Sequence, residues 1–191
     1  MLESQSQAPL ASKGELRRQF KNLRDGLPPE RRLAWSSQIC EHLAAYCSAA
    51  NIRSVGAFAP FLSEVDLGAL EFSNPHLAFC FPRVASLDPP RLAWGPRPLE
   101  PGRWGLLEPA IAPHAVPPVQ LLLVPGLAFA EDGHRLGYGK GFYDSVLAAL
   151  PTTTVALAVG FSVQRCERLP ASPRDCPVQG LATEEGITWI A

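Results

Sequence analysis

Hydrophobic residues recur at helical spacing near the N-terminus. Leu16, Phe20 and Leu23 follow one another at steps of four and three residues, which places them on one face of a helix. Ser12 is suited to cap this helix, because Glu15 stands three residues later, as in a capping box. A second helix is expected to begin at the next pair of prolines. Its inner side is predicted to comprise Leu33, Ile39, Cys40, Leu43 and Cys47.

Further along, apolar segments of strand length alternate with short helical patterns. The apolar run VQLLLV at 119–124 is typical of a parallel strand covered on both faces. The predicted strands are 52–60, 77–84, 91–94, 118–129 and 153–161, with a hairpin at 180–190 and helices at 65–72 and 141–151. This order predicts an α/β fold: a mainly parallel central sheet flanked by helices, as an open, Rossmann-like three-layer sandwich that ends in the hairpin.

Length and composition fit one domain. The chain has 191 residues, of which 47% are hydrophobic, and this suffices for a buried core. The small and polar residues 1–11 are predicted to be a flexible tail, and residues 12–191 a single domain. Many of the 20 prolines fall between residues 82 and 118, so this part is expected to be rich in loops.

Charge and cysteine usage narrow the class of protein. A formal net charge of −1 without a basic block argues against nucleic acid as a partner, so a bound anion needs a local group of cations. The N-terminal residues have neither a basic start nor an apolar run, and no segment is apolar for long enough to span a membrane. The 5 cysteines show no paired spacing, which suggests free thiols. We expect a cytoplasmic protein that has no membrane partner and acts as a monomer.

The segment RLGYGKGFYD, residues 135–144, is too poor in side chains to fill a core. Its alternating glycines allow positive φ values and a close approach of phosphate to the main chain, ahead of a helix N-terminus. Arg135 and Lys140 add positive charge, and Asp144 could hold a magnesium ion against the same phosphates. Two common signatures do not fit, because a glycine follows the lysine where GxxxxGK(S/T) needs a hydroxyl residue, and a phenylalanine replaces the last glycine of GxGxxG. The spacing indicates a phosphate-binding loop, with a tight strand-to-helix turn as the alternative.

The longer segment LLLVPGLAFAEDGHRLGYGKGFYD, residues 121–144, closely resembles the signature of the 5-formyltetrahydrofolate cyclo-ligases, also called methenyltetrahydrofolate synthetases. Further elements similar to that family lie in its order along most of the chain. They are KGELR at 13–17, FAPFLSEVD at 58–66, FPRV at 81–84, WGLLEP at 104–109 and DCPVQGLATEEG at 175–186. Several elements in this order are far more specific than the loop alone.

The resemblance implies that ATP and 5-formyltetrahydrofolate are converted to 5,10-methenyltetrahydrofolate, ADP and phosphate, with Mg²⁺ as cofactor. It also implies the residues of the site. The ATP-binding residues would be Lys13, Arg17, Arg135, Leu136, Gly137, Tyr138, Gly139, Lys140, Gly141, Phe142 and Tyr143, among which Arg135 and Lys140 would be the catalytic cations. The residues in contact with folate would be Ala59, Glu64, Tyr138 and Phe142, and those that bind Mg²⁺ would be Asp144 and Asp175.

The residue types suggest how some of these side chains act. Lys13 and Arg17 lie four residues apart on one helix face, so we expect them to close over a triphosphate from the side opposite the loop. The Glu64 carboxylate can accept hydrogen bonds from the N–H groups of a pterin ring. Trp104, together with Tyr138 and Phe142, is a candidate for stacking on that ring.

One position departs from the family pattern. Gln179 stands four residues after Asp175, where family members often carry an acid. If that acid helps to bind metal, this chain has one ligand fewer. Three alternatives stay open: a folate- or nucleotide-binding protein whose catalysis has lapsed, an ATP-using kinase of another small molecule, and an RNA-associated module that binds backbone phosphates.

Overall fold

The computed structural model describes residues 11–190, so the predicted tail, apart from residue 11, and residue 191 lie outside the described part. Helix α1 spans Lys13–Asp25 and α2 spans Pro29–Ala49. The Ser12 side chain accepts a hydrogen bond from the Glu15 backbone N–H, and the Glu15 carboxylate accepts one from the Ser12 backbone N–H at 2.9 Å. The predicted capping box and both helix starts are confirmed. The helices of the described part lack the length or the apolar character that a membrane span requires.

A seven-stranded sheet forms the centre of the fold, in the order β12-β11-β9-β6-β1-β2-β3. The strands from β11 to β2 run parallel to one another, and the two outermost strands, β12 and β3, run antiparallel to their neighbours. The strands are β1 (Ser54–Gly56), β2 (Ala78–Leu87), β3 (Pro90–Gly95), β6 (Leu121–Pro125), β9 (Val155–Val159), β11 (Gly180–Thr183) and β12 (Gly186–Trp189). The predicted mainly parallel sheet and the terminal hairpin are confirmed.

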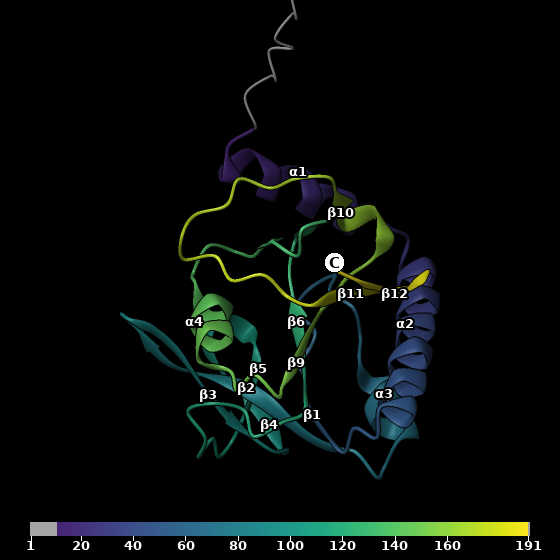
Figure 1. Cartoon of the computed structure of the whole chain (residues 1–191), viewed down its shortest axis with the longest axis vertical. Helices are drawn as coiled ribbons and strands as arrows, with labels where there is room; N and C mark the ends of the chain where they lie inside the picture. Colours follow the sequence, from purple (N-terminus) through teal and green to yellow (C-terminus); the bar gives the residue numbers. More distant parts are fainter. Residues whose placement is uncertain (1–10, 191) are drawn as a thin grey trace, which may run out of the picture.

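Helices cover both faces of this sheet, which makes three layers (Figure 1). Helices α2 and α3 (Gly68–Ser73) lie on one face and α4 (Phe142–Ala149) on the other. Alternate side chains of β6 point to opposite faces. Leu121 and Leu123 pack in the core with α2 and α3, whereas Leu122 packs in the core with α4, and all three are fully buried. The apolar run in the sequence thus reflects a strand that is buried on both sides.

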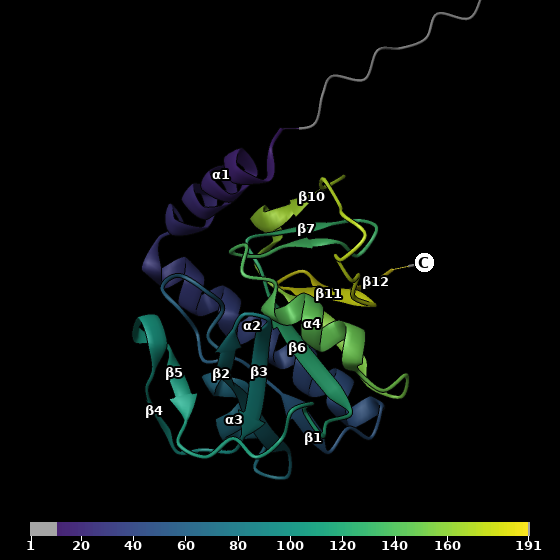
Figure 2. The same ribbon diagram turned by 90° about the vertical axis from the view of Figure 1, so that its left-hand side faces the viewer.

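Two small sheets extend the fold beyond what the sequence predicted. One consists of β10, β7 and β8 and lies next to α1 (Figure 2), and the other is a hairpin of β4 and β5. Their bounds are β4 (Leu99–Pro101), β5 (Leu107–Pro109), β7 (Ala128–Ala130), β8 (Arg135–Leu136) and β10 (Arg165–Cys166), with short 3-10 helices at Arg103–Gly105 and Ser162–Gln164. The expectation that residues 82–118 are rich in loops holds, because the four strands there are joined by loops, and no α-helix lies in this range. Several of the prolines there stand at strand ends, where proline is tolerated.

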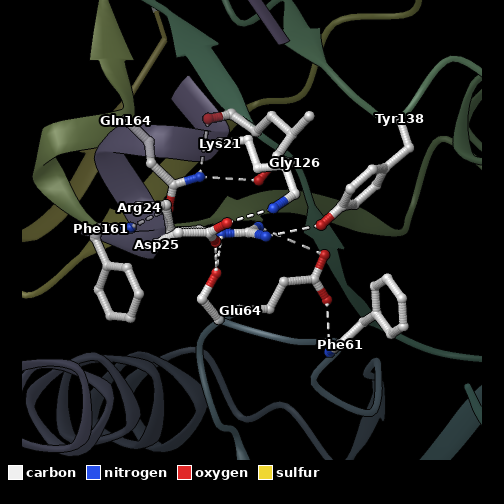
Figure 3. Close-up of polar contacts among 11 residues, drawn as sticks. Lys21, Arg24, Asp25, Phe61, Glu64, Gly126, Tyr138, Phe161 and Gln164 are labelled. Atoms are coloured by element: carbon white, nitrogen blue, oxygen red, sulfur yellow. Dashed lines mark hydrogen bonds and ion pairs between the residues drawn. The ribbon is translucent and has the colours of Figure 1, made fainter. Parts of the chain in front are cut away.

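Other expectations about local structure needed correction. Leu33 is 69% exposed and does not belong to the inner side of α2. The predicted strand 118–129 is two strands, β6 and β7, because the chain turns at Gly126, where a Cβ would lie 2.7 Å from the Phe129 ring. Buried Gln164 stabilises this turn by donating hydrogen bonds to the carbonyl oxygens of Gly126 and Leu127 at 2.9 and 3.0 Å (Figure 3). The turn directs the chain out of the central sheet towards α1.

Candidate functional site

The main cavity lies at the carboxyl ends of the adjacent strands β1 and β6. Its volume is about 1090 Å³, and it is lined by Phe58 and Ala59 just after β1 and by Pro125 and Gly126 at the end of β6. From β1 the chain continues to β2 on one side of the sheet order, and from β6 the central sheet continues to β9 on the other side. These two strands therefore form a topological switch point, where open α/β sheets bind their ligands.

The residues that the sequence suggested for the site all line this cavity. They are Lys13, Arg17, Ala59, Glu64, Trp104, the loop residues 135–143, Asp144 and Asp175. They come from α1, the segment after β1, the β4–β5 hairpin, β8, the glycine loop, the first turn of α4 and the segment 172–176. The fold thus brings side chains from distant parts of the sequence to one cavity. Lys13 and Asp175, for example, are 162 positions apart.

The glycine loop between β8 and α4 is held by α1. Arg17 donates a hydrogen bond from Nε to the Gly137 carbonyl oxygen at 2.9 Å. Gly139 has a φ of +91°, and a Cβ there would lie 3.0 Å from Arg17 Nη2, so both the backbone conformation and the close approach favour glycine. The expectation that Arg17 lies opposite the loop was wrong. Arg17 lies against it because α1 packs on the small sheet from which the loop emerges.

Two of the suggested phosphate-binding cations are paired with the two suggested metal ligands. Lys13 Nζ lies 2.5 Å from Asp175 Oδ2, and Arg135 Nη2 lies 3.1 Å from Asp144 Oδ1. We call these two contacts the loop-side pairs. Arg135 also donates through Nη1 to the Cys176 carbonyl oxygen at 3.1 Å, so it connects β8 both to α4 and to the segment that carries Asp175.

Lys140 and two aromatic residues line another part of the cavity. The ring centroids of Trp104 and Phe142 are 6.4 Å apart, and Lys140 Nζ lies 5.9 Å from the Trp104 ring. Trp104 is 52% exposed and has a φ of +56°, an uncommon value for a residue other than glycine. An exposed aromatic ring beside a cavity is suited to stack on a flat ligand, and the neighbouring ammonium group is suited to bind an anion.

A buried arginine that the sequence analysis missed connects two sides of the cavity (Figure 3). Arg24, in the last turn of α1, is fully buried and donates hydrogen bonds from Nε to Ser63 Oγ at 3.0 Å and from Nη2 to Tyr138 Oη at 2.7 Å. Its Nη1 lies 3.8 Å from Glu64 Oε1. We call these four residues the Arg24 cluster. The available sequence signal was helical spacing, because Arg24 follows Arg17 by seven residues and shares its face of the helix.

The Glu64 carboxyl group is almost fully buried within this cluster. Its Oε2 accepts a hydrogen bond from the Phe61 backbone N–H at 3.0 Å. Burial raises the pKa of Glu64 to about 7, although the Arg24 charge and the Phe61 N–H favour the ionised form and oppose this rise. Burial also raises the pKa of the Tyr138 hydroxyl, so that this group remains protonated at neutral pH. Glu64 is therefore close to the midpoint of its titration at neutral pH, which is common for functional carboxyl groups.

The remaining suggested residues contribute in simpler ways. The Tyr143 hydroxyl is buried and has no hydrogen-bond partner within residues 11–190, and burial raises its pKa strongly. Tyr143 lines the cavity with other atoms of its residue, because the hydroxyl oxygen itself is buried. Ala59 is half-buried and, with its small side chain, offers a ligand backbone and van der Waals contact.

The carboxylates of the cavity fit a magnesium ion that is held jointly with phosphates. Within residues 11–190, no group of three or more His, Cys, Asp or Glu side chains is arranged to hold a metal by itself. Magnesium sites usually combine one or two carboxylates with substrate phosphates and water, and Asp144 and Asp175 supply two carboxylates here. Partial burial would raise the pKa of Asp175, but hydrogen bonds from Lys13 and Ser172 outweigh burial and lower it. Asp175 is therefore ionised at neutral pH, as a metal ligand must be.

Gln179 lies away from this cavity. Its backbone N–H donates to the Ala156 carbonyl oxygen at 3.0 Å, and its Oε1 accepts from the Ala156 N–H at 2.6 Å. These contacts are at the amino ends of β9 and β11, whereas the main cavity lies at the carboxyl ends of the parallel strands. The glutamine in place of an acid therefore removes no side chain from the cavity lining.

Comparison with known proteins finds relatives over nearly the whole chain. A model of the 5-formyltetrahydrofolate cyclo-ligase family matches residues 9–184. The Mus musculus 5-formyltetrahydrofolate cyclo-ligase is 24% identical over 92% of this chain and 95% of its own length. The NMR structure of Aquifex aeolicus 5,10-methenyltetrahydrofolate synthetase is 31% identical, with a TM-score of 0.79 over 93% of this chain and 92% of that chain. A Mycoplasma pneumoniae 5,10-methenyltetrahydrofolate synthetase, 22% identical with a TM-score of 0.71 over 91% of this chain and 99% of its own, shares the fold.

Proposed function

This chain belongs to the 5-formyltetrahydrofolate cyclo-ligase family, and on that basis we propose that it is an enzyme that uses ATP to convert 5-formyltetrahydrofolate to 5,10-methenyltetrahydrofolate, with release of ADP and phosphate. One observation carries the proposal. A single cavity at the switch point of the sheet is lined both by the glycine loop with its cations and by Glu64 with the aromatic residues. One cavity can therefore hold a triphosphate beside a pteridine.

The chemistry explains why such a site suffices. A formamide carbon is a poor electrophile, and its oxygen is a poor leaving group. Transfer of the γ-phosphoryl group breaks its bond to ADP and forms a bond to the formyl oxygen. The N10 amine then attacks the activated carbon, and the ring closes as phosphate leaves and N10 loses its proton. Phosphoryl transfer depends mainly on positioning and charge neutralisation, so cations and N–H donors can perform it without a protein nucleophile.

The lining residues divide between the two substrates. Arg135 and Lys140 would neutralise charge on the transferred phosphoryl group, while Lys13, Arg17 and the main chain of residues 136–143 would bind the rest of the triphosphate. Residues that would contact the folate are Ala59, Glu64, Trp104, Tyr138 and Phe142. Asp144 and Asp175 would hold Mg²⁺, which supplies further neutralisation of phosphate charge when it is bound.

The direct test is incubation with 5-formyltetrahydrofolate, with and without MgATP, while the absorbance of the methenyl product is followed. We expect product only with MgATP, and one ADP per product. Binding of both substrates without turnover would instead support a protein whose catalysis has lapsed. ADP formation without the methenyl product would support a kinase of another small molecule.

The proposal extends to the context in which the enzyme acts. We propose that residues 12–191 form a single domain that is active as a monomer in the cytoplasm, without a nucleic-acid partner. The near-zero net charge and the five free cysteines support this context. Light scattering during turnover measures the assembly state, and a steep salt dependence of RNA binding would contradict the absence of a nucleic-acid partner.

A further inference from the structure

Arg24 is a charged side chain in a place where solvent cannot reach it. A buried guanidinium is costly unless its donors are used. Arg24 uses Nε and Nη2 for hydrogen bonds to Ser63 and Tyr138, while Nη1 faces Glu64 at 3.8 Å and has no hydrogen-bond partner within residues 11–190. Glu64 and Tyr138 line the cavity, but Arg24 does not. Any effect of Arg24 on a ligand must therefore pass through these neighbours.

The surroundings of Arg24 keep its guanidinium in one orientation (Figure 3). The Ser63 hydroxyl accepts from Arg24 and donates to the Asp25 carboxylate, which also accepts from Lys21. On the other side, the guanidinium lies 5.9 Å from the centre of the Tyr138 ring. The same ring meets Phe61 edge-on, with centroids 6.2 Å apart. The guanidinium is thus held from both sides. Its planar group directs two donors to two different acceptors, which an ammonium group cannot reproduce.

We infer that Arg24 is a positioning residue for the folate, which fixes Glu64 and Tyr138 relative to each other as the two sides of a pteridine subsite. Glu64 belongs to the segment after β1 and Tyr138 to the glycine loop, so neither segment by itself sets the distance between them. Arg24 contacts both. In this arrangement the carboxylate accepts pteridine N–H groups while the tyrosine ring packs against the ring system. The inference rests on the proposed function, since it concerns the folate half of the same site.

The first test variant is Arg24→Met, which removes the charge and the donors but keeps a flexible stem. The dissociation constant for 5-formyltetrahydrofolate, measured by calorimetry, should rise ~10–100-fold, because Glu64 and Tyr138 lose their common partner. The dissociation constant for a non-hydrolysable ATP analogue should change less than about threefold. Arg24 contacts the glycine loop through the Tyr138 side chain, whereas the triphosphate would be bound by the main chain of the loop and by the cations of the loop-side pairs.

The pH dependence of folate binding separates the proposed role of Arg24 from a purely structural one. Loss of packing alone would leave the pH at which affinity falls unchanged. The charged or titratable groups that face Glu64 are Arg24 from α1, Tyr138 from the loop and Tyr143 from α4. Among them, Arg24 is the cation that favours the ionised carboxylate. In Arg24→Met the loss of affinity at low pH should therefore begin at a higher pH than in the unaltered protein.

Three further variants make the test decisive. Arg18→Met is the matched control, because Arg18 is an exposed arginine of the same helix outside the cavity lining; both dissociation constants should stay unchanged. Arg24→Lys keeps a charge in the buried position, which favours folding, but a lysine cannot reach Ser63 and Tyr138 together, so folate binding should weaken selectively. Tyr138→Phe leaves the buried cation in place and should show part of the same selective loss.

Two results would overturn the inference. One is unchanged folate affinity in a folded Arg24 variant and in Tyr138→Phe. The other is an equal weakening of folate and nucleotide binding, which would indicate a general structural role. If the unaltered protein binds neither ligand, the proposed function fails instead, and this outcome is visible before any variant is made.

Discussion

The loop-side pairs and the Arg24 cluster hold charge in the same cavity in two different ways. In the loop-side pairs the carboxylate side chains are 20% and 28% exposed, so solvent or a ligand can reach them. In the Arg24 cluster the side chains of Arg24 and Glu64 are only 1% and 8% exposed, and the guanidinium is shared among several groups. The carboxylates of the first arrangement are accessible enough to exchange partners, although the Arg135 side chain itself is only 4% exposed, whereas neither Arg24 nor Glu64 is accessible in the second.

This difference suggests how one cavity can serve two ligands of unlike chemistry. A triphosphate is highly charged. The protein cations that bind it can therefore be paired with carboxylates before it binds, and these carboxylates then become available to a metal ion. A pteridine ring offers N–H groups without charge, so it needs acceptors that are already in position. We therefore expect changes on the loop side to affect rate and nucleotide affinity, and changes in the Arg24 cluster to affect folate affinity and its pH dependence.

The largest effect is expected for Arg135→Met. This change removes the cation that connects β8 with Asp144 and with the Cys176 carbonyl group. Loss of one preorganised donor to developing charge should lower kcat ~10²–10³-fold, with little change in the KM for folate. Steady-state kinetics of methenyl formation measure both.

A matched control for this variant is Arg97→Met. Arg97 is also ion-paired, with its Nε 2.7 Å from Glu71 Oε1, but it lies outside the cavity lining. Its loss should leave kcat unchanged. If Arg135→Met weakened folate binding and spared kcat, the division between the two sides of the cavity would be wrong.

A smaller effect is expected for Lys140→Ala. Within residues 11–190 this lysine has no carboxylate partner, so its removal leaves no acid unpaired. Loss of a charge-assisted contact worth ~1.5–3 kcal/mol should reduce nucleotide affinity or rate roughly 10–100-fold. Arg53→Ala is the control, because Arg53 is an exposed cation before the amino end of β1. Full activity of Lys140→Ala would remove this lysine from the site.

The pH dependence of folate binding tests whether Glu64 of the Arg24 cluster binds the folate in its ionised form. The pKa of Glu64 is raised to about 7, so the carboxylate is ionised above pH 7 and protonated below it. If the ionised form accepts the pteridine N–H groups, affinity should fall about tenfold for each pH unit below 7. Calorimetry without nucleotide, from roughly pH 5.5 to 8.5, measures this dependence. Glu64→Gln should bind weakly and without this dependence, and a flat profile in the unaltered protein would exclude an ionised Glu64 as the acceptor.

The smallest effect is expected for Asp175→Asn measured without metal. The change frees Lys13 and removes a negative charge near the phosphates. A partly exposed ion pair contributes ~0.2–1 kcal/mol, so the affinity for metal-free ATP should rise by up to about fivefold. The control Asp132→Asn alters an exposed acid outside the cavity lining and should change nothing. A lower affinity for metal-free ATP would mean that the Lys13–Asp175 pair does not exchange on binding.

Local pattern was sufficient for the parts of this protein whose structure depends on near neighbours. The capping box of α1, the apolar run of β6 and the terminal hairpin were all predicted, because a helical turn or a pleated strand is determined within a few residues. Resemblance to a family then supplied candidate site residues from several distant segments, and these line one cavity. Their identity could be read from the sequence, but their partners could not.

The sequence by itself therefore determined the α/β order, the glycine loop and its cations. Tertiary structure alone decided that Lys13 forms an ion pair with Asp175, that Arg17 lies against the loop, and that Arg24 is buried. An arginine in the last turn of a surface helix ordinarily reaches solvent, so the helical spacing that places Arg24 on the face of Arg17 does not by itself predict its burial. Burial is also what raises the pKa of Glu64. Such properties depend on which distant segments meet and exclude water, and these contacts exist only once the chain has folded.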